Sequence, residues 1–505
     1  MTRRLPARPS LEHLKKQAKV LHEQLASGNP QAHERFRALL SRSAPATPQL
    51  ADAQLALARD YGFTSWAKLK AHVEAQAPAD PPAELVAAIH TNDAGRVRAV
   101  LERYPALRTQ LNDTMPGLHF GATPLLAAVP FTNREMIDVL LAAGADINQR
   151  SHWWAGGFGV LDDDRGLAPF LIERGARVDV NAAAKLGMMD VLERLVTGDS
   201  ELVHARGGDG QTPLHVASTI DVARWLLDHG ADIDARDVDH ESTPAQYMVR
   251  GRQEVARFLV SRGCRTDIFT AAALGDLELA RRHLDADPEC VRMFVADEWF
   301  PKRDPRSGGC IYIWTLGQLA TPHGVAREFG HEDVFQLLMD RSPEELKLAL
   351  ACELGDEATS QRLLARRPTA SRTMNDADRS HLARAAQSNN TNAVRLMLAA
   401  GWPVVVRGQH GGTPLHWAAW HGNAAMVREI LRYDPPLELR GDDHDLTALG
   451  WALHGSEHGW HRKTGDYAGV VEALLAAGAK LPELTDDLEA SEAVRAVLRR
   501  YSQEA

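Results

Sequence analysis

One sequence pattern recurs at wide intervals along this chain and constrains its fold more than any other feature. The segment GGTPLHWAAWHGNAAMVREIL (411–431) matches GQTPLHVASTIDVARWLLDHGADIDAR (210–236) and GATPLLAAVPFTNREMIDVLLAAGADINQR (121–150). Weaker copies span 242–268 and 320–342. A unit of this length cannot bury its apolar residues alone, so neighbouring copies must stack. The pattern therefore predicts a solenoid of stacked repeats.

The residue types within each copy predict its local structure. Thr212 and Thr413 each precede a proline. A threonine hydroxyl caps a helix at this position, and the following proline loses no hydrogen bond because the first helical N–H has no partner. Gly144 and Gly230 follow apolar runs and are expected to end helices with a positive φ. Each copy is thus predicted to contain two helices and an extended finger.

The TPLH motif, the later Leu-Leu pair and the closing Gly-Ala-Asp resemble the ankyrin repeat over most of residues 83–480. This resemblance implies an all-α fold, an ankyrin-repeat solenoid. It also implies that His215 and His416 are structural, because TPLH histidines in this family bond to the backbone of adjoining turns. The function it implies is protein–protein interaction or scaffolding through the fingers and the concave face.

A second type of repeat lacks the TPLH motif. Its helix-to-helix turns align on Asn92, Gly187, Gly275 and Gly355, with separations of 95, 88 and 80 residues. This spacing corresponds to about three repeats and indicates duplication of a block of repeats. Counting both types, we expect about twelve repeats.

Two smaller regions are expected at the ends of the sequence. Residues 1–78 are predicted to form a small helical module with a cap at Ser10 and a linker at 41–48. Its segments LPARPSLEHLKKQAK and YGFTSWAKLKAHV resemble a leader that precedes ankyrin repeats in many bacterial proteins. Residues 481–505 are predicted to form a C-terminal helical cap.

Three insertions interrupt the regular pattern, at 151–164, 293–320 and 454–465. Insertions in solenoids are often found at binding faces. The segment IYIW within the second insertion favours a strand, so we expect a hairpin there. Gly455 and Gly459 disfavour a helix in the third insertion, which is therefore expected to be a loop.

Histidine also replaces the aspartate expected at several fingertips, three residues before a helix-starting threonine. The adjacent pairs Asp239–His240 and Asp443–His444 are expected to point their side chains apart in an extended finger. The fingertip histidines and the residues of the insertions together make up the candidate binding set: Trp153, Trp154, His240, Trp299, Tyr312, Trp314, His410, His444, His454, His458, Trp460 and His461.

We expect no catalytic residues, no cofactor and no metal. A metal site needs three or four converging donors. A helix would place His454, His458 and His461 on one face, but the neighbouring glycines argue against that helix. The alternative to a protein-binding solenoid is a small-molecule-binding protein or an enzyme, with an aromatic and histidine-lined pocket formed by the three insertions.

Charge and hydropathy restrict the partners and the compartment. The net charge of −10 argues against nucleic acid, although residues 1–76 are basic, with 12 Lys and Arg against 6 Asp and Glu. No apolar run approaches the roughly 18 residues that span a bilayer, so no membrane partner is expected. The four cysteines are far apart and no secretory signal is visible, which favours a cytoplasmic protein.

Overall fold

A computed structural model describes the chain except for residues 1–4, 6–10, 27, 41–47, 49, 76–79, 164, 368–373, 444, 485–487 and 505. Regular structure in the described part is helical, with one isolated β-bridge between Arg440 and Thr447. The predicted all-α fold is confirmed. The chain forms two compact units, one of residues 81–408 and one that contains 1–80 and 409–505. None of the described helices is long and apolar enough to cross a bilayer.

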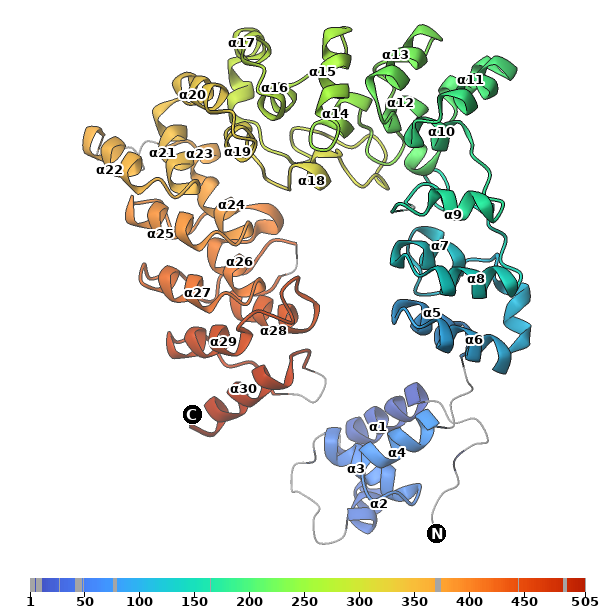
Figure 1. Cartoon of the computed structure of the whole chain (residues 1–505). Helices are drawn as coiled ribbons and strands as arrows, with labels where there is room; N and C mark the ends of the chain where they lie inside the picture. Colours follow the sequence, from blue (N-terminus) through green and yellow to red (C-terminus); the bar gives the residue numbers. More distant parts are fainter. Residues whose placement is uncertain are drawn as a thin grey trace. The chain divides into compact units, whose positions relative to one another are not determined.

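In the unit of residues 81–408, successive helices form antiparallel pairs (Figure 1). First helices contact first helices of the next pair, as α5 contacts α7, and second helices do the same, as α6 contacts α8. The pairs are α5 (Pro81–His90) with α6 (Ala94–Arg103), α7 (Pro124–Ala128) with α8 (Arg134–Ala142), α10 (Val180–Leu186) with α11 (Met189–Gly198), α12 (Pro213–Val216) with α13 (Ile220–Asp228), α14 (Pro244–Met248) with α15 (Gln253–Ser261), α16 (Ile268–Leu274) with α17 (Leu277–Ala286), α19 (Pro322–Glu328) with α20 (Glu332–Arg341), α21 (Glu344–Glu353) with α22 (Glu357–Arg366), and α24 (His381–Gln387) with α25 (Thr391–Ala399).

One repeat of this unit has a single α-helix, α9 (Ala168–Glu173), as the shortened sequence there predicts. Two further pairs follow in the other unit, α26 (Pro414–Trp420) with α27 (Ala424–Leu431) and α28 (Ala448–His458) with α29 (Tyr467–Ala476). Within the described chain these make eleven pairs and one single-helix repeat. The prediction of about twelve repeats is confirmed.

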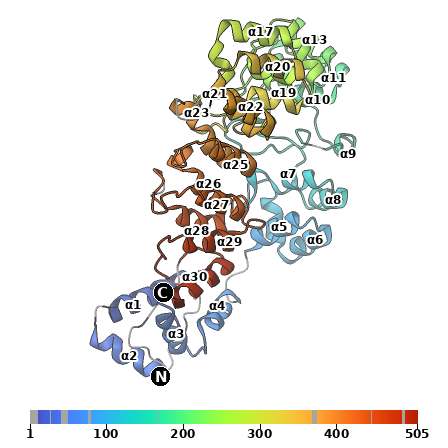
Figure 2. The same cartoon turned by 90° about the vertical axis from the view of Figure 1, so that its left-hand side faces the viewer.

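The final repeats and the C-terminal helix can be followed in Figure 2, where α26 to α29 lie in successive rows. Helix α30 (Glu492–Glu504) packs on α29 and buries Val494 and Leu498, so a helix is present where the C-terminal cap is expected. This amphipathic helix covers an apolar face that the last repeat would otherwise expose.

The N-terminal residues form the four helices α1 (Leu11–Ala26), α2 (Pro30–Leu40), α3 (Leu50–Asp60) and α4 (Trp66–Ala75). Asn29 caps α2 through hydrogen bonds from the Gln31 and Ala32 amides to its side-chain oxygen. The expected Ser10 cap and nearly all of the 41–48 linker lie outside the described residues.

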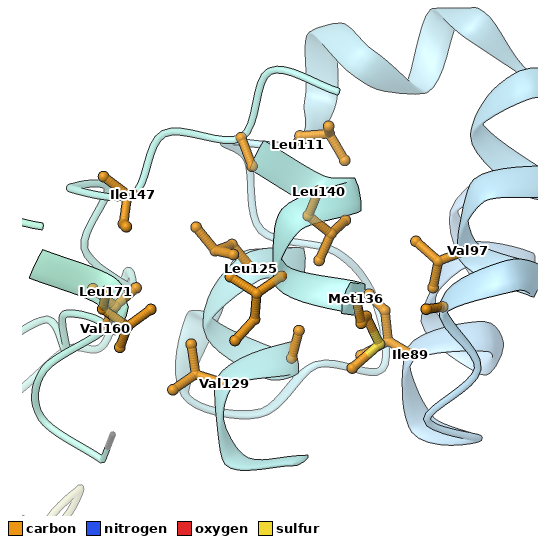
Figure 3. Packing of buried hydrophobic residues seen from close by; sticks show 14 of the residues in the cluster. Ile89, Val97, Leu111, Leu125, Val129, Met136, Leu140, Ile147, Val160 and Leu171 are labelled. Carbon is orange, nitrogen blue, oxygen red and sulfur yellow. The ribbon is translucent and has the colours of Figure 1, made fainter. Parts of the chain in front are cut away.

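Apolar side chains from neighbouring repeats pack into shared core clusters, and Figure 3 shows the cluster of the first repeats. Ile89 and Val97 of the first pair lie beside Met136 and Leu140 of α8, and Leu125 of α7 is buried between repeats. Each fully buried side chain of this size contributes about 1.5–3 kcal/mol relative to exposure. No repeat could obtain that stabilisation without its neighbour.

The turn residues have the backbone conformation that the sequence predicts. Asn92, Gly187, Gly275 and Gly355 all have positive φ, between 55° and 71°. Their shared left-handed geometry supports the alignment of the second repeat type. The helix-ending glycine Gly230 likewise has a φ of 94°.

The TPLH histidines are structural. The Thr212 amide donates to Nδ1 of His215 at 3.1 Å, and Nε2 of His215 donates to the Ser242 carbonyl of the next finger at 3.0 Å. His416 makes the equivalent bond to the Leu446 carbonyl at 3.2 Å. Burial lowers the pKa of His215 to about 4, so this side chain is neutral at physiological pH.

The predicted hairpin in the second insertion is wrong. Residues of the IYIW segment form the short helix α18 (Tyr312–Thr315). Tyr312 is fully buried, with its hydroxyl 3.0 Å from the Thr270 hydroxyl, whereas Trp314 is 69% exposed. A single helical turn can bury one of these aromatics and expose the other. Packing against the repeats outweighs the weak β-propensity of so short a run.

Candidate functional site

Two places in the structure bring predicted site residues together, one in each compact unit. The first, which we call the tryptophan pocket, has a volume of about 440 Å³. It is lined by His410, Trp417, Trp420, Leu446, Trp451, His454 and Trp460. The second, which we call the fingertip cluster, consists of Asp209, Asp239 and His240.

Helix geometry explains how the tryptophan pocket forms. Trp417 and Trp420 lie three residues apart on α26, and Trp451 and His454 have the same spacing on α28. Residues at this spacing share one helix face. Because α26 and α28 are in contact, the two faces together form a continuous aromatic wall. Trp460 is contributed by the segment that follows α28.

The tryptophan rings of the pocket include one stacked pair and two nearly perpendicular pairs. Trp417 and Trp460 are stacked, with centroids 6.2 Å apart and an interplanar angle of 25°. Trp451 stands at 83° to Trp417, and Trp420 stands at 89° to Trp460. A group entering the pocket would therefore meet ring faces from more than one direction.

The tryptophans differ in exposure and in hydrogen bonding. Trp417 is 3% exposed, whereas Trp460 is 59% exposed. The buried indole N–H groups of Trp417 and Trp420 have no hydrogen-bond partner among the described residues. An unpaired buried donor typically costs about 1–3 kcal/mol. The pocket therefore combines one exposed aromatic anchor, Trp460, with a more deeply buried aromatic wall.

Histidines and carboxylates surround the pocket. Nδ1 of His410 lies 2.7 Å from Oδ2 of Asp443. His454 stacks on Trp420, with centroids 5.9 Å apart. The His461 ring lies 5.2 Å from the His421 ring, which in turn lies 5.6 Å from the Trp460 ring. The candidate His444 lies outside the described residues.

The third insertion is more helical than predicted. Helix α28 continues through Gly455 and ends at His458, so His454 and His458 are helical residues and not loop residues. A side chain at Gly455 would lie only 2.9 Å from the Trp420 carbonyl oxygen and 3.0 Å from the Tyr467 ring. Glycine is therefore used here for close helix packing, and this packing outweighs its low helix propensity.

In the unit of residues 81–408, the fingertip cluster combines two carboxylates with an imidazole. Nε2 of His240 lies 3.6 Å from Oδ2 of Asp239 and 3.9 Å from Oδ2 of Asp209. The expectation that Asp239 and His240 point apart is wrong. The finger is a tight turn, because the His240 amide donates to the Asp237 carboxylate at 2.8 Å and Glu241 has a φ of 48°.

The second insertion folds over this fingertip and fixes its side chains. Nδ1 of His240 donates to the Gly309 carbonyl at 2.9 Å, and the Gly308 amide donates to the Asp239 carboxylate at 3.1 Å. Because a carbonyl only accepts, Nδ1 carries the proton and Nε2 faces the carboxylates. The resulting cluster is mostly buried.

Burial also changes the acidity of the fingertip cluster. It raises the pKa of Asp209 to about 6, with smaller raising effects from Asp239 and Asp237, while His240 acts in the opposite direction. Burial likewise raises the pKa of Asp237. Ionised carboxylates held close together in a buried site repel one another, so proton uptake there is favoured.

We predict that Asp209→Asn stabilises the protein at pH 8 but has little effect at pH 4.5. The folded-state pKa of Asp209, about 6, exceeds that of an unfolded aspartate. The folded state therefore loses stability as the pH rises from the unfolded value through the folded one. Replacing the carboxylate removes the loss. Thermal midpoints of both proteins across this pH range test the prediction, with the exposed Asp190→Asn as a control. An equal gain at both pH values would contradict it.

The aromatic candidates of the first two insertions occupy different environments. The Trp153 ring packs at 5.0 Å from the Phe120 ring, and the Arg306 guanidinium lies 4.2 Å above the Trp154 ring. Trp299 packs against Phe294 at 6.3 Å. The contact between Arg306 and Trp154 shows that the insertions at 151–164 and 293–320 meet each other.

Two further candidates belong to the second insertion. Trp314 is exposed with its ring 6.3 Å from the His240 ring, whereas Tyr312 belongs to the core and is not available to a partner. The third insertion belongs to the other compact unit.

Several site residues were not among the predicted candidates, namely Asp209, Asp239, Trp417, Trp420, Leu446, Trp451 and Glu489, whose carboxylate lies 3.4 Å from Nδ1 of His454. The spacing of Trp417 and Trp420 on a predicted helix was a usable signal, because it places both on one face. Glu489 offered no such signal, since its position depends on how the chain returns after α29.

Comparison with known protein families agrees with this architecture. Family models described as ankyrin repeats match residues 180–270, 348–443 and 382–482, and a single ankyrin repeat matches 120–152. Together these matches cover slightly more than half of the chain. The chain belongs to the ankyrin-repeat family. Ankyrin repeats typically mediate protein–protein interaction.

Individual relatives match only parts of this ankyrin-repeat protein. It is 26% identical over 140 residues to mouse ankyrin repeat and SAM domain-containing protein 6, covering 27% of this chain and 16% of the relative. It is 29% identical over 159 residues to putative ankyrin repeat protein FPV031 of fowlpox virus, covering 29% and 39%. It is 40% identical over 75 residues to the serine/threonine-protein kinase VIK of Arabidopsis thaliana, covering 14% and 17%. The chain thus spans well under two thirds of each relative.

Proposed function

We propose that this ankyrin-repeat protein binds a protein partner through the tryptophan pocket, and that the pocket receives a cationic side chain of that partner. The observation that carries the proposal is the convergence of four tryptophans on one pocket of about 440 Å³. Trp is the strongest cation–π partner among the aromatic side chains, and Arg and Lys are the cations that proteins offer.

The surroundings of the pocket support a cationic and peptidic ligand. Asp443 and Glu489 lie close to its histidines, and the whole chain carries a net charge of −10. These charges attract a basic partner and disfavour nucleic acid. A peptide that contains Arg or Lys supplies such a cation.

We propose a cytoplasmic setting for this interaction. All four cysteines are buried and unpaired, which suits a reducing compartment.

Trp460→Ala is expected to weaken binding of a basic peptide by about tenfold or more, because Trp460 is the exposed anchor of the pocket. The thermal midpoint should change little, since more than half of this residue's surface is exposed. Peptides selected from a random displayed library on the immobilised full chain provide the ligands, and calorimetry measures their affinities.

Trp314→Ala is the matched control for this experiment, because Trp314 is also more than half exposed but lies in the other unit. This variant should bind the selected peptides like the unchanged protein. Selection of peptides that lack Arg and Lys would contradict the cationic ligand. Unchanged peptide affinity in Trp460→Ala would contradict binding in the tryptophan pocket. A steep fall in the thermal midpoint of this variant would identify Trp460 as structural.

A second candidate function is small-molecule binding beside the fingertip cluster. A pocket of about 380 Å³ lies between this finger and the second insertion. His240, Asp267, Trp299 and Lys302 are among its lining residues, so it offers charged and aromatic groups together. A small molecule that competes with no selected peptide, but loses affinity in Trp299→Ala, would favour this second function.

A further inference from the structure

Helix α28 presents two imidazoles on one exposed face. His454 and His458 lie one helical turn apart, and their ring centroids are separated by 4.6 Å. Residues four apart on a helix project in the same direction, so both rings can turn their nitrogens toward one point. The sequence expectation of no metal depended on Gly455 interrupting this helix. The helix is intact, so that objection no longer applies.

A carboxylate completes the set of donors. Oε2 of Glu489 lies 3.4 Å from Nδ1 of His454 and 3.5 Å from Nε2 of His458. Zinc binds such nitrogens and oxygens at about 2.0–2.2 Å in tetrahedral geometry, which places neighbouring donor atoms about 3.3 Å apart. The observed separations of Glu489 from the two imidazoles match this spacing to within a few tenths of an ångström.

The segment that carries Glu489 is anchored to α28. The Ser491 amide donates to the Ser456 hydroxyl at 2.9 Å, and Ser456 lies on α28 between the two histidines. Arg495 holds the same segment from the other side by donating to the Ala490 carbonyl at 3.0 Å. These bonds position the carboxylate beside the helix even without direct attraction from the imidazoles.

Stacking also restrains one imidazole. The His454 ring lies nearly parallel to the Trp420 ring, at an angle of 26°. An exposed His–Glu ion pair alone would contribute only about 0–1 kcal/mol. Such a pair needs one histidine, whereas the arrangement here supplies two imidazoles to the same carboxylate oxygen. All three donor atoms lie within 4.8 Å of one another, so small rotations of these exposed side chains would let one ion contact all three.

We propose that His454, His458 and Glu489 bind a divalent transition-metal ion of the zinc class. Two imidazoles and a carboxylate are the donor types that zinc prefers, together with thiolate. All three residues are exposed, so the ion has an entry path and its fourth position is open to water or to another ligand. The metal site adjoins the tryptophan pocket, because His454 belongs to both, but none of its three ligands is one of the tryptophans that carry the peptide proposal.

Calorimetric titration of the full chain with Zn²⁺ at pH 7.5 tests the site. We expect one saturable site that is weakened more than about thirtyfold in the double variant His454→Gln/His458→Gln, and about tenfold in Glu489→Gln. Co²⁺ gives a second readout, because tetrahedral coordination produces visible absorption bands that octahedral hydrated Co²⁺ lacks. His461→Gln is the matched control, since His461 lies just beyond α28 with its ring beside that of His421 and is not one of the three donors.

Two results would overturn the proposal. One is the absence of saturable Zn²⁺ binding by the unchanged protein. The other is equal binding by the double variant, and Asp239→Asn would then show whether the fingertip cluster is the true site. Circular dichroism confirms that each variant is folded. The Trp460→Ala variant should retain Zn²⁺ affinity, so failure of the metal proposal and failure of the peptide proposal can be distinguished.

Discussion

Gly156→Ala is expected to lower the free energy of unfolding by about 3 kcal/mol or more. Gly156 has a φ of 143°, which an L-residue rarely adopts. A Cβ atom there would lie within 3.0 Å of both the Gly207 carbonyl oxygen and the Gly210 amide nitrogen. Both neighbours are backbone atoms of the next finger and cannot rotate away. The variant should separate the first insertion from that finger.

Gly144→Ala is the matched control for this prediction. Gly144 also has a positive φ, of 107°, but no atom would contact the added Cβ atom within 4 Å. The loss there should be only about 1–2 kcal/mol, from backbone strain alone. Urea denaturation, followed by tryptophan fluorescence, measures both variants. Equal losses would show that the first insertion does not depend on close contact at Gly156.

Acidification from pH 7 to pH 4 is expected to destabilise the unit of residues 81–408 by several kcal/mol. Burial lowers the pKa of both His215 and His323 to about 4. An unfolded histidine titrates near 6.5, so between these values the unfolded state binds more protons. The stability that these two neutral histidines contribute is therefore fully present above about pH 6.5 and is lost as the pH falls toward about 4. Each histidine contributes about 3 kcal/mol, and Asp209 offsets part of the total.

His323→Gln should lower the number of protons taken up on unfolding by about one, because it removes one buried titrating group. The free energy of unfolding should therefore depend less steeply on pH. Urea denaturation at several values between pH 4 and pH 7 gives the slopes. His229→Gln is the control, since His229 is exposed on the same unit. A slope in His323→Gln equal to that of the unchanged protein would show that the acid sensitivity arises elsewhere.

The repeat structure could be predicted because its determinants are local. Thr212 and His215 lie within one helical turn of each other, and their mutual hydrogen bonds depend on little beyond that turn. Gly187 and Gly230 adopt positive φ because their own sequence allows it. Interactions that span a few residues recur wherever the motif recurs.

The candidate sites were only partly predictable. Trp460 and His454 were identified as site residues, but the pocket also needs Trp417 and Trp451, which come from two different helices. His240 was identified, whereas its approach to Asp209 depends on contact between two fingers. Each site combines a residue that stands out in the sequence with partners that are ordinary in their own segments.

The sequence by itself determined the ankyrin repeats, their number and their helix-ending turns, because short-range hydrogen bonds and apolar periodicity specify them. Only the tertiary structure decided which conformation the insertions adopt. IYIW became a helix because Tyr312 packs into the core, and α28 continued past Gly455 because Trp420 and Tyr467 need that space. Glu489 reaches His454 through the anchoring of a distant segment. Such outcomes depend on which surfaces meet, and the local sequence does not contain that information.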